Sequence, residues 1–501
     1  MTAELAKSPP SQDSFLSKFT VLKGALRELW VMFGTKVLSI VAYGLVNSTL
    51  ILWLSKDMQF GDISAGVVVT FWSTVLTLIT VMIGSLVDTI GIKKSLIIGF
   101  VFCIIARGVM SFFTNPWLVV PTGLLPLAIG EAMMTPVIVA GIKKYATVAQ
   151  RSMAFSLFYA MMNVGFAISG TCFDKVRTTL GEYGSYTLPF GNVTLSTYQT
   201  LIFLGFLCTI PNLLLVCFGI REGIAINEND EIVHEKRDNK YAGQPMAKAI
   251  LLSCQDCLKQ WVATFGSLWK QPAFYRFLMF LSIVVCVRLI FYHFHYTFPK
   301  YGIRELGEGA PIGRLFGVLN PVLIIFLGPI IGALTQKYSA YKVVIIGSFI
   351  AALSVFFMAV PPVWYNSLAH GPLGNFICNT WLGQNTPIDQ INPLFVGIFF
   401  AVILLSIGEA FYSPRLYEYP AAIAPKGQEG SYMSLSLLPY FIAKFFVGLL
   451  SGWLLTTFCP AEGPRNSEMM WLIIGGMAML TPIGLLVFKK KIQVKEAGRD
   501  D

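Results

Sequence analysis

Six charged side chains interrupt the long apolar stretches of this sequence: Lys36, Arg107, Glu131, Arg288, Glu409 and Lys444. A charged side chain at the centre of a bilayer costs roughly 2.5 to 3.5 kcal/mol on insertion scales, so each of them is a candidate functional residue. The four cations outnumber the two carboxylates, and a solute with a carboxylate or phosphate group would balance that surplus. Structural pairing, for instance of Arg107 with Glu131, is the alternative interpretation.

Polar residues at helical spacing accompany several of these charges. Five sets each share one helix face: Lys36, Ser39, Tyr43 and Asn47; Ser156, Tyr159 and Asn163; Arg288, Tyr292 and His295; Ser406, Glu409, Ser413 and Tyr417; Tyr440, Lys444 and Ser451. We expect Lys36 and Arg288 to bind the negative group of a solute, and Glu409 to meet an amine or a coupling proton. Glu131, Glu409 and His295 are the candidates for proton coupling, because buried carboxyl groups and imidazoles can exchange protons near neutral pH.

A membrane-spanning scaffold must position these residues. Apolar residues make up 55% of the 501 positions and charged residues only 13%, which excludes an ordinary soluble domain. About twelve runs are long enough to cross a bilayer as helices. They centre near Tyr43, Thr77, Ile104, Gly130, Met162, Leu207, Val284, Ile324, Ala351, Leu404, Phe441 and Met477. The sequence therefore predicts an all-α membrane protein with twelve transmembrane helices.

One long hydrophilic stretch divides these runs six and six. The expected units are a tail at 1–28, a six-helix bundle at 29–220, a linker with a surface helix at 221–273, a second bundle at 274–488 and a tail at 489–501. Basic residues before the first span and after the last one predict that both termini are cytoplasmic. The net charge of +10 lies largely beside spans, which indicates contact with the lipid bilayer and not with nucleic acid.

A loop motif occurs twice, after the second and the eighth span. The first copy contains Gly84, Asp88, Gly91, Lys93 and Lys94, and resembles the major facilitator signature G-x-L-x-D-R-x-G-R-R. A degraded copy begins at Gly332, and 332 − 84 = 248 positions separate the two first glycines. The resemblance implies the major facilitator fold, with two pseudo-symmetric six-helix halves around a central site. It also implies that the first copy of the motif takes part in the conformational change.

Three further segments resemble the proton-dependent oligopeptide transporter family. They are Phe155 to Gly165 (F-x-x-F-Y-x-x-x-N-x-G), Asn320 to Pro329 (N-P-x-x-I-x-x-x-x-P) and Gly408 to Pro414 (G-E-x-x-x-S-P). By that resemblance, Asn163 and Asn320 would contact a peptide backbone, Glu409 would meet its amino group, and Tyr43 would belong to the first-span part of the site. Lys36, Ser39 and Ile40 stand where that family has E-x-x-E-R, and Thr135 stands where it has a lysine.

These features predict a secondary active transporter of a small anionic or zwitterionic solute that works by alternating access. Proton-coupled symport of di- and tripeptides is the function that the resemblance implies, with H⁺ as coupling ion and no cofactor or metal. Other readings are an organic-anion or drug antiporter or uniporter, and a receptor that has lost transport. We expect a monomer and no enzyme activity. The sequence leaves open whether Cys378 and Cys459, both in predicted outer loops, form a disulfide.

Overall fold

The computed structural model describes residues 22–493, except 190, 228–229, 235–243, 336, 424–437 and several positions between 246 and 267. Only the backbone is described at 81–89, 148–149, 152, 234, 417–418, 420–423, 438 and 440–441. At Gly84 and Asp88 only the backbone is therefore described, and much of the expected surface helix of the linker lies outside the described part of the chain.

Six spans form the first half of the molecule. They are α2 (Arg27–Lys56), α3 (Asp62–Ile90), α4 (Ile92–Phe112), the continuous run of α5 (Pro116–Val119), π-helix η1 (Val120–Leu124) and α6 (Leu125–Tyr145), then α7 (Val148–Leu180) and α8 (Thr197–Gly219). Strands β1 (Ser185–Thr187) and β2 (Thr194–Ser196) pair antiparallel between α7 and α8. A second antiparallel pair, β3 (Ile224–Ile226) and β4 (Ile232–His234), follows α8.

The second half also has six spans. They are α10 (Pro272–Tyr296), π-helix η2 (Gly313–Val318) with α12 (Leu319–Leu334), α13 (Ala340–Ala359), α16 (Leu394–Ile423), α18 (Leu438–Phe458) and α19 (Ser467–Val487). Shorter helices connect or follow them: α11 (Phe298–Leu306), η3 (Pro362–Tyr365), α14 (Asn366–Ala369), α15 (Pro372–Asn375), η4 (Phe376–Trp381), η5 (Ile388–Gln390) and α20 (Lys489–Ile492).

The prediction of a twelve-span all-α membrane protein is confirmed. Eleven helices are long and apolar enough to cross a membrane, and the described part of α18 adds a shorter apolar helix, Ile442–Phe458. The expected centre of the eleventh span, Phe441, lies within α18, and residues 424–437 before this helix lie outside the described part of the chain.

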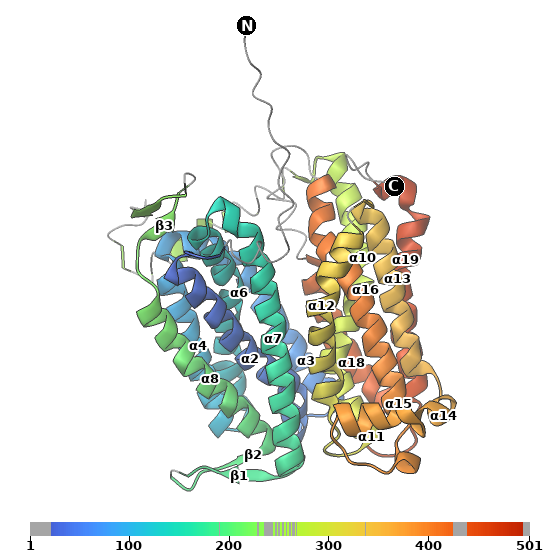
Figure 1. The fold of residues 1–501 in the computed structure, drawn as a ribbon. Coiled ribbons are helices and arrows are strands. Elements are labelled where there is room, and N and C mark those ends of the chain that lie inside the picture. Colours follow the sequence, from blue (N-terminus) through green and yellow to red (C-terminus); the bar gives the residue numbers. More distant parts are fainter. Residues whose placement is uncertain are drawn as a thin grey trace.

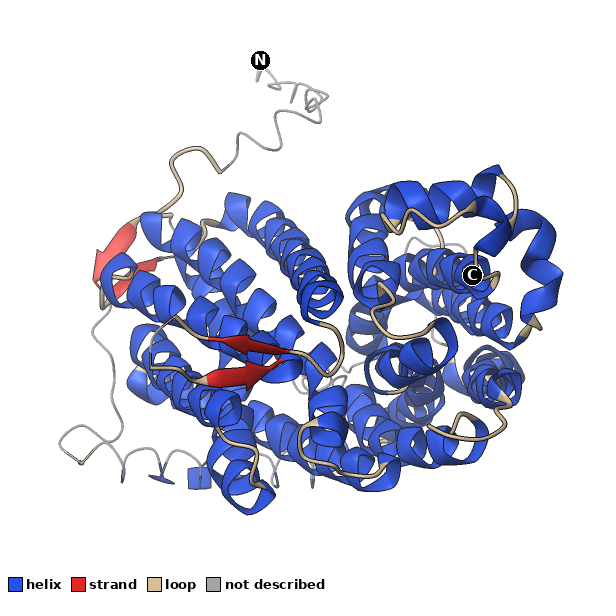
Figure 2. Cartoon of the chain, turned by 90° about the horizontal axis from the view of Figure 1, so that it is seen from below, coloured by secondary structure: helices blue, strands red, loops and turns tan. Residues whose placement is uncertain are grey.

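The two halves lie side by side as separate helix groups (Figure 1). The beginning of α2 and the end of α19 lie at one end of the molecule, which we call the linker end. The opposite end carries the β1–β2 pair and α11, and we call it the hairpin end. Figure 2 looks onto the hairpin end and shows both helix groups, with the strand pair across the first one.

The first copy of the loop motif forms a one-residue turn. Gly91, which alone separates α3 from α4, has φ +85°, a conformation that side-chain-bearing residues rarely adopt. The first copy of the motif therefore contains a tight glycine turn between two spans. Lys94, three residues later, forms an exposed ion pair with Glu222 at 3.8 Å.

Ion pairs and a helix cap join the two halves at the hairpin end. The Asp62 carboxylate, at the beginning of α3, accepts hydrogen bonds from Lys300 Nζ at 2.7 Å and from Arg304 Nη2 at 2.9 Å. Asp174 of α7 accepts the backbone N–H groups of Gly313 and Arg314 at 2.7 and 2.6 Å. This carboxylate thus caps the beginning of η2 from the other half, where a helix dipole favours negative charge.

Glycines bring helices of the two halves into backbone contact beside these polar groups. A Cβ atom on Gly66 of α3 would lie 2.3 Å from the carbonyl oxygen of Gly448 on α18. On the other side of the molecule, a Cβ atom on Gly170 of α7 would lie 3.0 Å from the carbonyl oxygen of Gly313. Small residues allow such close approach between helices in a membrane. The structure is therefore closed at the hairpin end.

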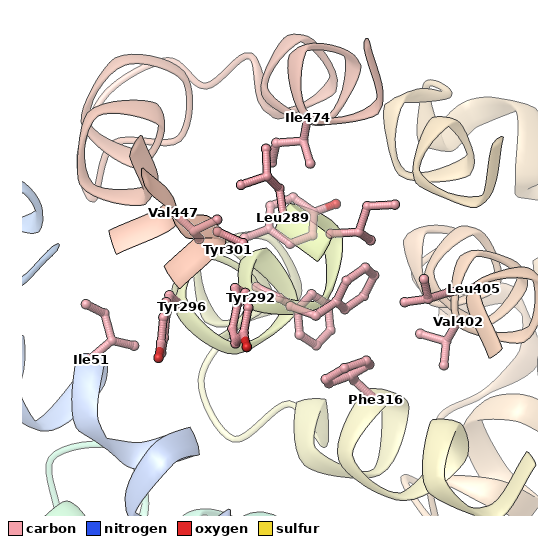
Figure 3. Packing of buried hydrophobic residues seen from close by; sticks show 14 of the residues in the cluster. Ile51, Leu289, Tyr292, Tyr296, Tyr301, Phe316, Val402, Leu405, Val447 and Ile474 are labelled. Atoms are coloured by element: carbon pink, nitrogen blue, oxygen red, sulfur yellow. The ribbon is translucent and has the colours of Figure 1, made fainter. Parts of the chain in front are cut away.

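Helix α10 lies at the centre of the second half. Figure 3 shows its side chains among Phe316 of η2, Leu405 of α16, Val447 of α18 and Ile474 of α19. Ile51 of α2 faces this cluster from the first half. Residues on α10 can therefore face α2 and the second-half helices at once, which suits this helix to carry a site between the halves.

The two cysteines of the predicted outer loops are not paired. Cys378, in η4, and Cys459, which follows α18, are both buried free thiols. The Cys459 thiol lies 3.8 Å from a carboxylate oxygen of Glu305. The disulfide that the sequence left open is absent at these two residues.

Asp57, which follows α2 at the hairpin end, gives a testable pH dependence. Burial raises the pKa of this carboxyl to about 6, although a hydrogen bond from Ser196 opposes the shift. An unfolded aspartate titrates near pH 3.9, so folding is disfavoured by the buried charge above about pH 6 and becomes more favourable as the pH falls towards 4. Asp57→Asn should therefore melt at a higher temperature than the wild type at pH 8, and the difference should vanish near pH 4. Equal differences at both pH values would contradict this account.

Candidate functional site

A cavity of about 240 Å³ lies between the two halves. Its lining from the first half consists of Tyr43 and Asn47 on α2, and Tyr159, Met162 and Phe166 on α7. Its lining from the second half consists of Arg288, Phe291, Tyr292 and His295 on α10, Glu409 and Ser413 on α16, and Lys444 on α18. A smaller cavity of about 40 Å³ shares His295 and Phe166 with it and extends to Gly313 of η2.

The charged side chains of this lining all belong to the second half. They are Arg288, Glu409 and Lys444, whereas the first half contributes two tyrosines, an amide, a thioether and a phenyl ring. Arg288 is 5% exposed and Glu409 is 9% exposed, so both charges are shielded from bulk solvent. Electrostatic interactions in such surroundings are stronger than in water.

Glu409 is held in place by two polar neighbours. Asn320 Nδ2, on α12, donates to Glu409 Oε2 at 3.0 Å and to Ser406 Oγ at 3.0 Å. Arg288 lies close enough to interact electrostatically with Glu409. Asn320 itself is buried and is not part of the cavity lining, so in this structure it orients the carboxylate.

Arg288 crosses from α10 towards α16. Its Nη1 atom donates to Ser413 Oγ at 3.3 Å, and its guanidinium lies 5.1 Å from the ring centre of Tyr412. Ser413 follows Glu409 by one helical turn on α16. The predicted polar stripes on α10 and α16 therefore meet at the cavity.

Lys444 enters the cavity from α18. Its Nζ atom lies 5.4 Å from the ring centre of Tyr292 and makes no ion pair with the residues that the structure describes. His295, one helical turn beyond Tyr292, is close enough to interact electrostatically with Lys444. The Nδ1 atom of His295 lies 2.8 Å from the Phe291 carbonyl oxygen, so this ring nitrogen is the donor.

Lys36 and Glu131 form a separate buried cluster in the first half. Lys36 Nζ donates to Thr135 Oγ1 at 3.2 Å and lies 4.4 Å from the ring centre of Phe158. Glu131 pairs with Arg107, which also donates to Thr209 Oγ1 at 2.7 Å. Structural pairing, the alternative interpretation for Arg107 and Glu131, is what the structure contains.

The contact of Lys36 with Thr135 relates two departures from the peptide-transporter pattern. The family pattern has a lysine at the position of Thr135 on the fourth span, and this chain has a lysine opposite it on the first span instead. The two positions at which this chain departs from the pattern therefore meet at the contact of α2 with α6. The two positions are 99 residues apart, so only the structure shows that they meet.

The structure places the predicted site residues in two groups. Tyr43, Arg288, His295 and Glu409 line the cavity. The other predicted residues lie behind it or away from it: Lys36, Glu131, Asn163 and Asn320. Asn163 Nδ2 donates to the Tyr159 carbonyl oxygen at 2.9 Å, within its own helix. That these four residues bind substrate or carry a proton stays a prediction.

Lys444, Tyr292 and Ser413 also line the cavity, although the sequence indicates no specific role in binding or coupling for any of them. Each belongs to a polar stripe that the sequence shows, so periodicity had identified their helix faces. The same spacing would also occur if Lys444 extended from a helix end to the membrane surface. The packing of α18 against α10 shows that it enters the cavity instead.

Comparisons with known proteins agree with this architecture. The Major Facilitator Superfamily matches the chain over residues 32–388. The fold is similar to a POT family transporter in complex with 5-aminolevulinic acid, at 15% identity and a TM-score of 0.68 over 96% of this chain and 99% of that one. It is also similar to a peptide transporter POT in complex with sulfate, at 14% identity and a TM-score of 0.65 over 95% and 98%. A POT family transporter in complex with a thioalcohol-conjugated peptide matches at 16% identity and a TM-score of 0.66 over 93% and 97%. The comparison with curated proteins gave no match.

Proposed function

The chain belongs to the Major Facilitator Superfamily of secondary transporters, and from this premise we propose that it transports a small anionic or zwitterionic solute. The observation that carries the proposal is the cavity between the halves, with Arg288, Lys444 and Glu409 in its lining. Two cations and one carboxylate match a solute with one negative group and one amine, or with a negative group alone.

The size of the cavity favours a small solute over a drug-sized one. Pockets for drug-sized ligands occupy about 300 to 1,000 Å³, and this cavity measures about 240 Å³. An amino acid or a short peptide fits that volume better than a large hydrophobic drug. The buried charges also favour an ionic solute, because a neutral hydrophobic one would leave Lys444 without a counter-charge.

The contacts at the hairpin end stabilise one state of an alternating-access cycle. Asp62 holds Lys300 and Arg304, and Asp174 caps η2, each across the boundary between the halves. Transport requires that these contacts break while others form at the linker end. We propose that the solute enters and leaves by this rocking of the two halves, with a proton gradient as the energy source.

The solved relatives indicate which probes to use first. One was solved with 5-aminolevulinic acid, one with a peptide conjugate and one with sulfate. The first two probes are accordingly 5-aminolevulinic acid, which carries a carboxylate and an amine, and the dipeptide alanyl-alanine.

The test is uptake by purified protein in liposomes under an imposed proton gradient. We expect at least one of the two probes to accumulate above the level of protein-free liposomes, and a proton carrier such as a protonophore to remove the accumulation. Uptake that does not depend on the gradient would support the uniporter alternative. Thermal stabilisation by a probe without any uptake would support the receptor alternative, because ligand binding alone raises apparent stability.

A further inference from the structure

We propose that the second half alone binds both charged ends of the solute, with Lys444 and Arg288 on its negative group and Glu409 on its amine, against a neutral wall formed by the first half. This inference rests on the proposed function. It assigns a binding role to Lys444 and makes this residue a determinant of the preference for anionic solutes.

The distribution of charge between the two walls is the first observation. All three charged lining residues come from α10, α16 and α18, and the five lining residues of the first half are uncharged. Among the described lining residues, the cations that can pair with a negative group of the solute therefore all belong to the second half. The first half offers the hydroxyl groups of Tyr43 and Tyr159, the amide of Asn47 and apolar surface.

The state of the first-half charges is the second observation. Lys36 is 1% exposed and donates to Thr135, and Arg107 is 2% exposed and pairs with Glu131. None of these four residues belongs to the cavity lining. Separating a buried pair to bind a solute would leave a second charge uncompensated, at a cost of several kcal/mol. Arg107 and Glu131 are therefore committed to the packing of their own half, and Lys36 donates to Thr135 outside the cavity lining.

The surroundings of Lys444 are the third observation. Its Nζ atom lies 5.4 Å from the Tyr292 ring centre, and it has no carboxylate partner among the described residues. A cation over an aromatic face is attracted by about 0.5 to 2 kcal/mol, which is less than a direct ion pair with hydrogen bonds provides. A carboxylate or phosphate group of the solute would complete the coordination of this ammonium group.

The position of Tyr292 brings Lys444 and Arg288 into one subsite. Arg288 and Tyr292 are one helical turn apart on α10, so their side chains lie on the same face. Lys444 reaches that face from α18 through its contact with Tyr292. Glu409 interacts electrostatically with Arg288 and accepts a hydrogen bond from Asn320 of α12. A zwitterion would thus place its negative group near α18 and its amine near α12.

This arrangement affects the transport cycle. When the two halves rock, the charged groups of the solute keep their partners, because Arg288, Glu409 and Lys444 move together with the second half. The contacts that change are those with the neutral first-half wall. Ion pairs then need not be broken and remade at each step, which avoids exposing a desolvated charge during the movement.

The experiment compares three probes that differ in one charged group each. 5-Aminolevulinic acid has both groups, its methyl ester lacks the negative charge, and levulinic acid lacks the amine. Dissociation constants are measured with purified wild type, Lys444→Gln, Glu409→Gln, Lys36→Gln and the control Lys342→Gln. Lys342 is a matched control because its Nζ atom also lies over a tyrosine ring, at 4.9 Å from that of Tyr338, but outside the cavity.

The expected result is a selective loss in each variant. The wild type should bind the acid about tenfold to 100-fold more tightly than the ester, the range that a charged hydrogen bond provides. Lys444→Gln should lose most of this preference while its affinity for the ester stays the same. Glu409→Gln should instead lose the preference for 5-aminolevulinic acid over levulinic acid. Lys342→Gln and Lys36→Gln should keep both preferences.

Two other results would overturn the inference, and they differ from failure of the proposed function. If Lys444→Gln keeps the acid preference, or if Lys36→Gln loses it, the negative group is bound elsewhere while the proposed function stands. If the wild type does not prefer the acid over the ester, the proposed anionic solute is wrong and the inference falls with it. Lys444→Met, which also removes the charge, replaces Lys444→Gln if that variant does not fold.

Discussion

Replacement of Gly66 with alanine is expected to lower the ratio of the state that is closed at the hairpin end to the state that is open there by about fivefold to 150-fold. The added Cβ atom would lie 2.3 Å from the Gly448 carbonyl oxygen, a backbone atom that a rotamer change cannot move. Overpacking of this kind costs about 1 to 3 kcal/mol, and the cost applies only where α3 and α18 are in contact. Uptake should fall because one state of the cycle becomes rare.

Spin labels at Tyr186 and Glu308 would measure this change. Both side chains are exposed at the hairpin end, one in each half. In Gly66→Ala the distance between the labels should shift towards longer values. Gly328→Ala is the matched control, because Gly328 also lies within a transmembrane helix and a Cβ atom there would meet nothing within 4 Å. An unchanged distance distribution in Gly66→Ala would mean that this glycine contact does not determine closure.

The sequence predicts the overall fold well because each span must satisfy its own backbone hydrogen bonds in lipid. Apolar length alone is then enough to find twelve helices, and the loops at Gly84 and Gly332 relate the two halves. Helical spacing also identified the faces that carry Tyr43, Arg288 and Glu409. These predictions concern one helix at a time, which is why a single sequence could supply them.

The sequence does not show where along a polar stripe the cavity ends. Lys36 and Tyr43 share one face of α2, but seven residues correspond to about 10 Å along the helix axis. At Tyr43 this face borders the cavity, whereas at Lys36 it packs against Thr135 of α6 and Phe158 of α7. Periodicity gives the direction of a side chain but not the helix that it meets. The role first expected for Lys36 depended on that missing information.

Contacts between the halves were equally hidden in the sequence. Arg304 pairs with Asp62, which is 242 residues away. The spacing of Gly448 and Gly452 is the small-residue pattern of closely packed helices, but the pattern does not name the partner. In the structure, these two glycines pack against Gly66 and Asp62 of α3.

Glu409→Gln is expected to reduce proton-driven accumulation of solute by about tenfold or more while exchange of solute across the membrane continues. Among the described lining residues Glu409 is the one carboxylate, and it interacts with Arg288 and with Asn320. Protonation of Glu409 would weaken its attraction for Arg288 and for a solute amine, which couples proton transfer to solute release. A coupling of 1 to 3 kcal/mol corresponds to the expected loss.

The measurement separates coupling from binding by comparing two assays in liposomes. Accumulation under a pH gradient should fall in Glu409→Gln, and its dependence on external pH should disappear. Counterflow, which exchanges labelled for unlabelled solute without a gradient, should retain most of the wild-type rate when the solute concentration is high enough to saturate the variant. If both assays fall together, Glu409 acts in binding alone and the coupling group must be sought elsewhere.

Glu131→Gln serves as the comparison, because Glu131 is the other buried carboxyl group that the sequence suggests for coupling. Its charge is paired with Arg107 and lies outside the cavity, so its removal leaves a buried guanidinium without its counter-charge. We therefore expect Glu131→Gln to lower the melting temperature and to leave the pH response of uptake unchanged. A flat pH response in Glu131→Gln, with a normal one in Glu409→Gln, would reverse the assignment. The proton would then cross through the cluster around Lys36, separately from the solute.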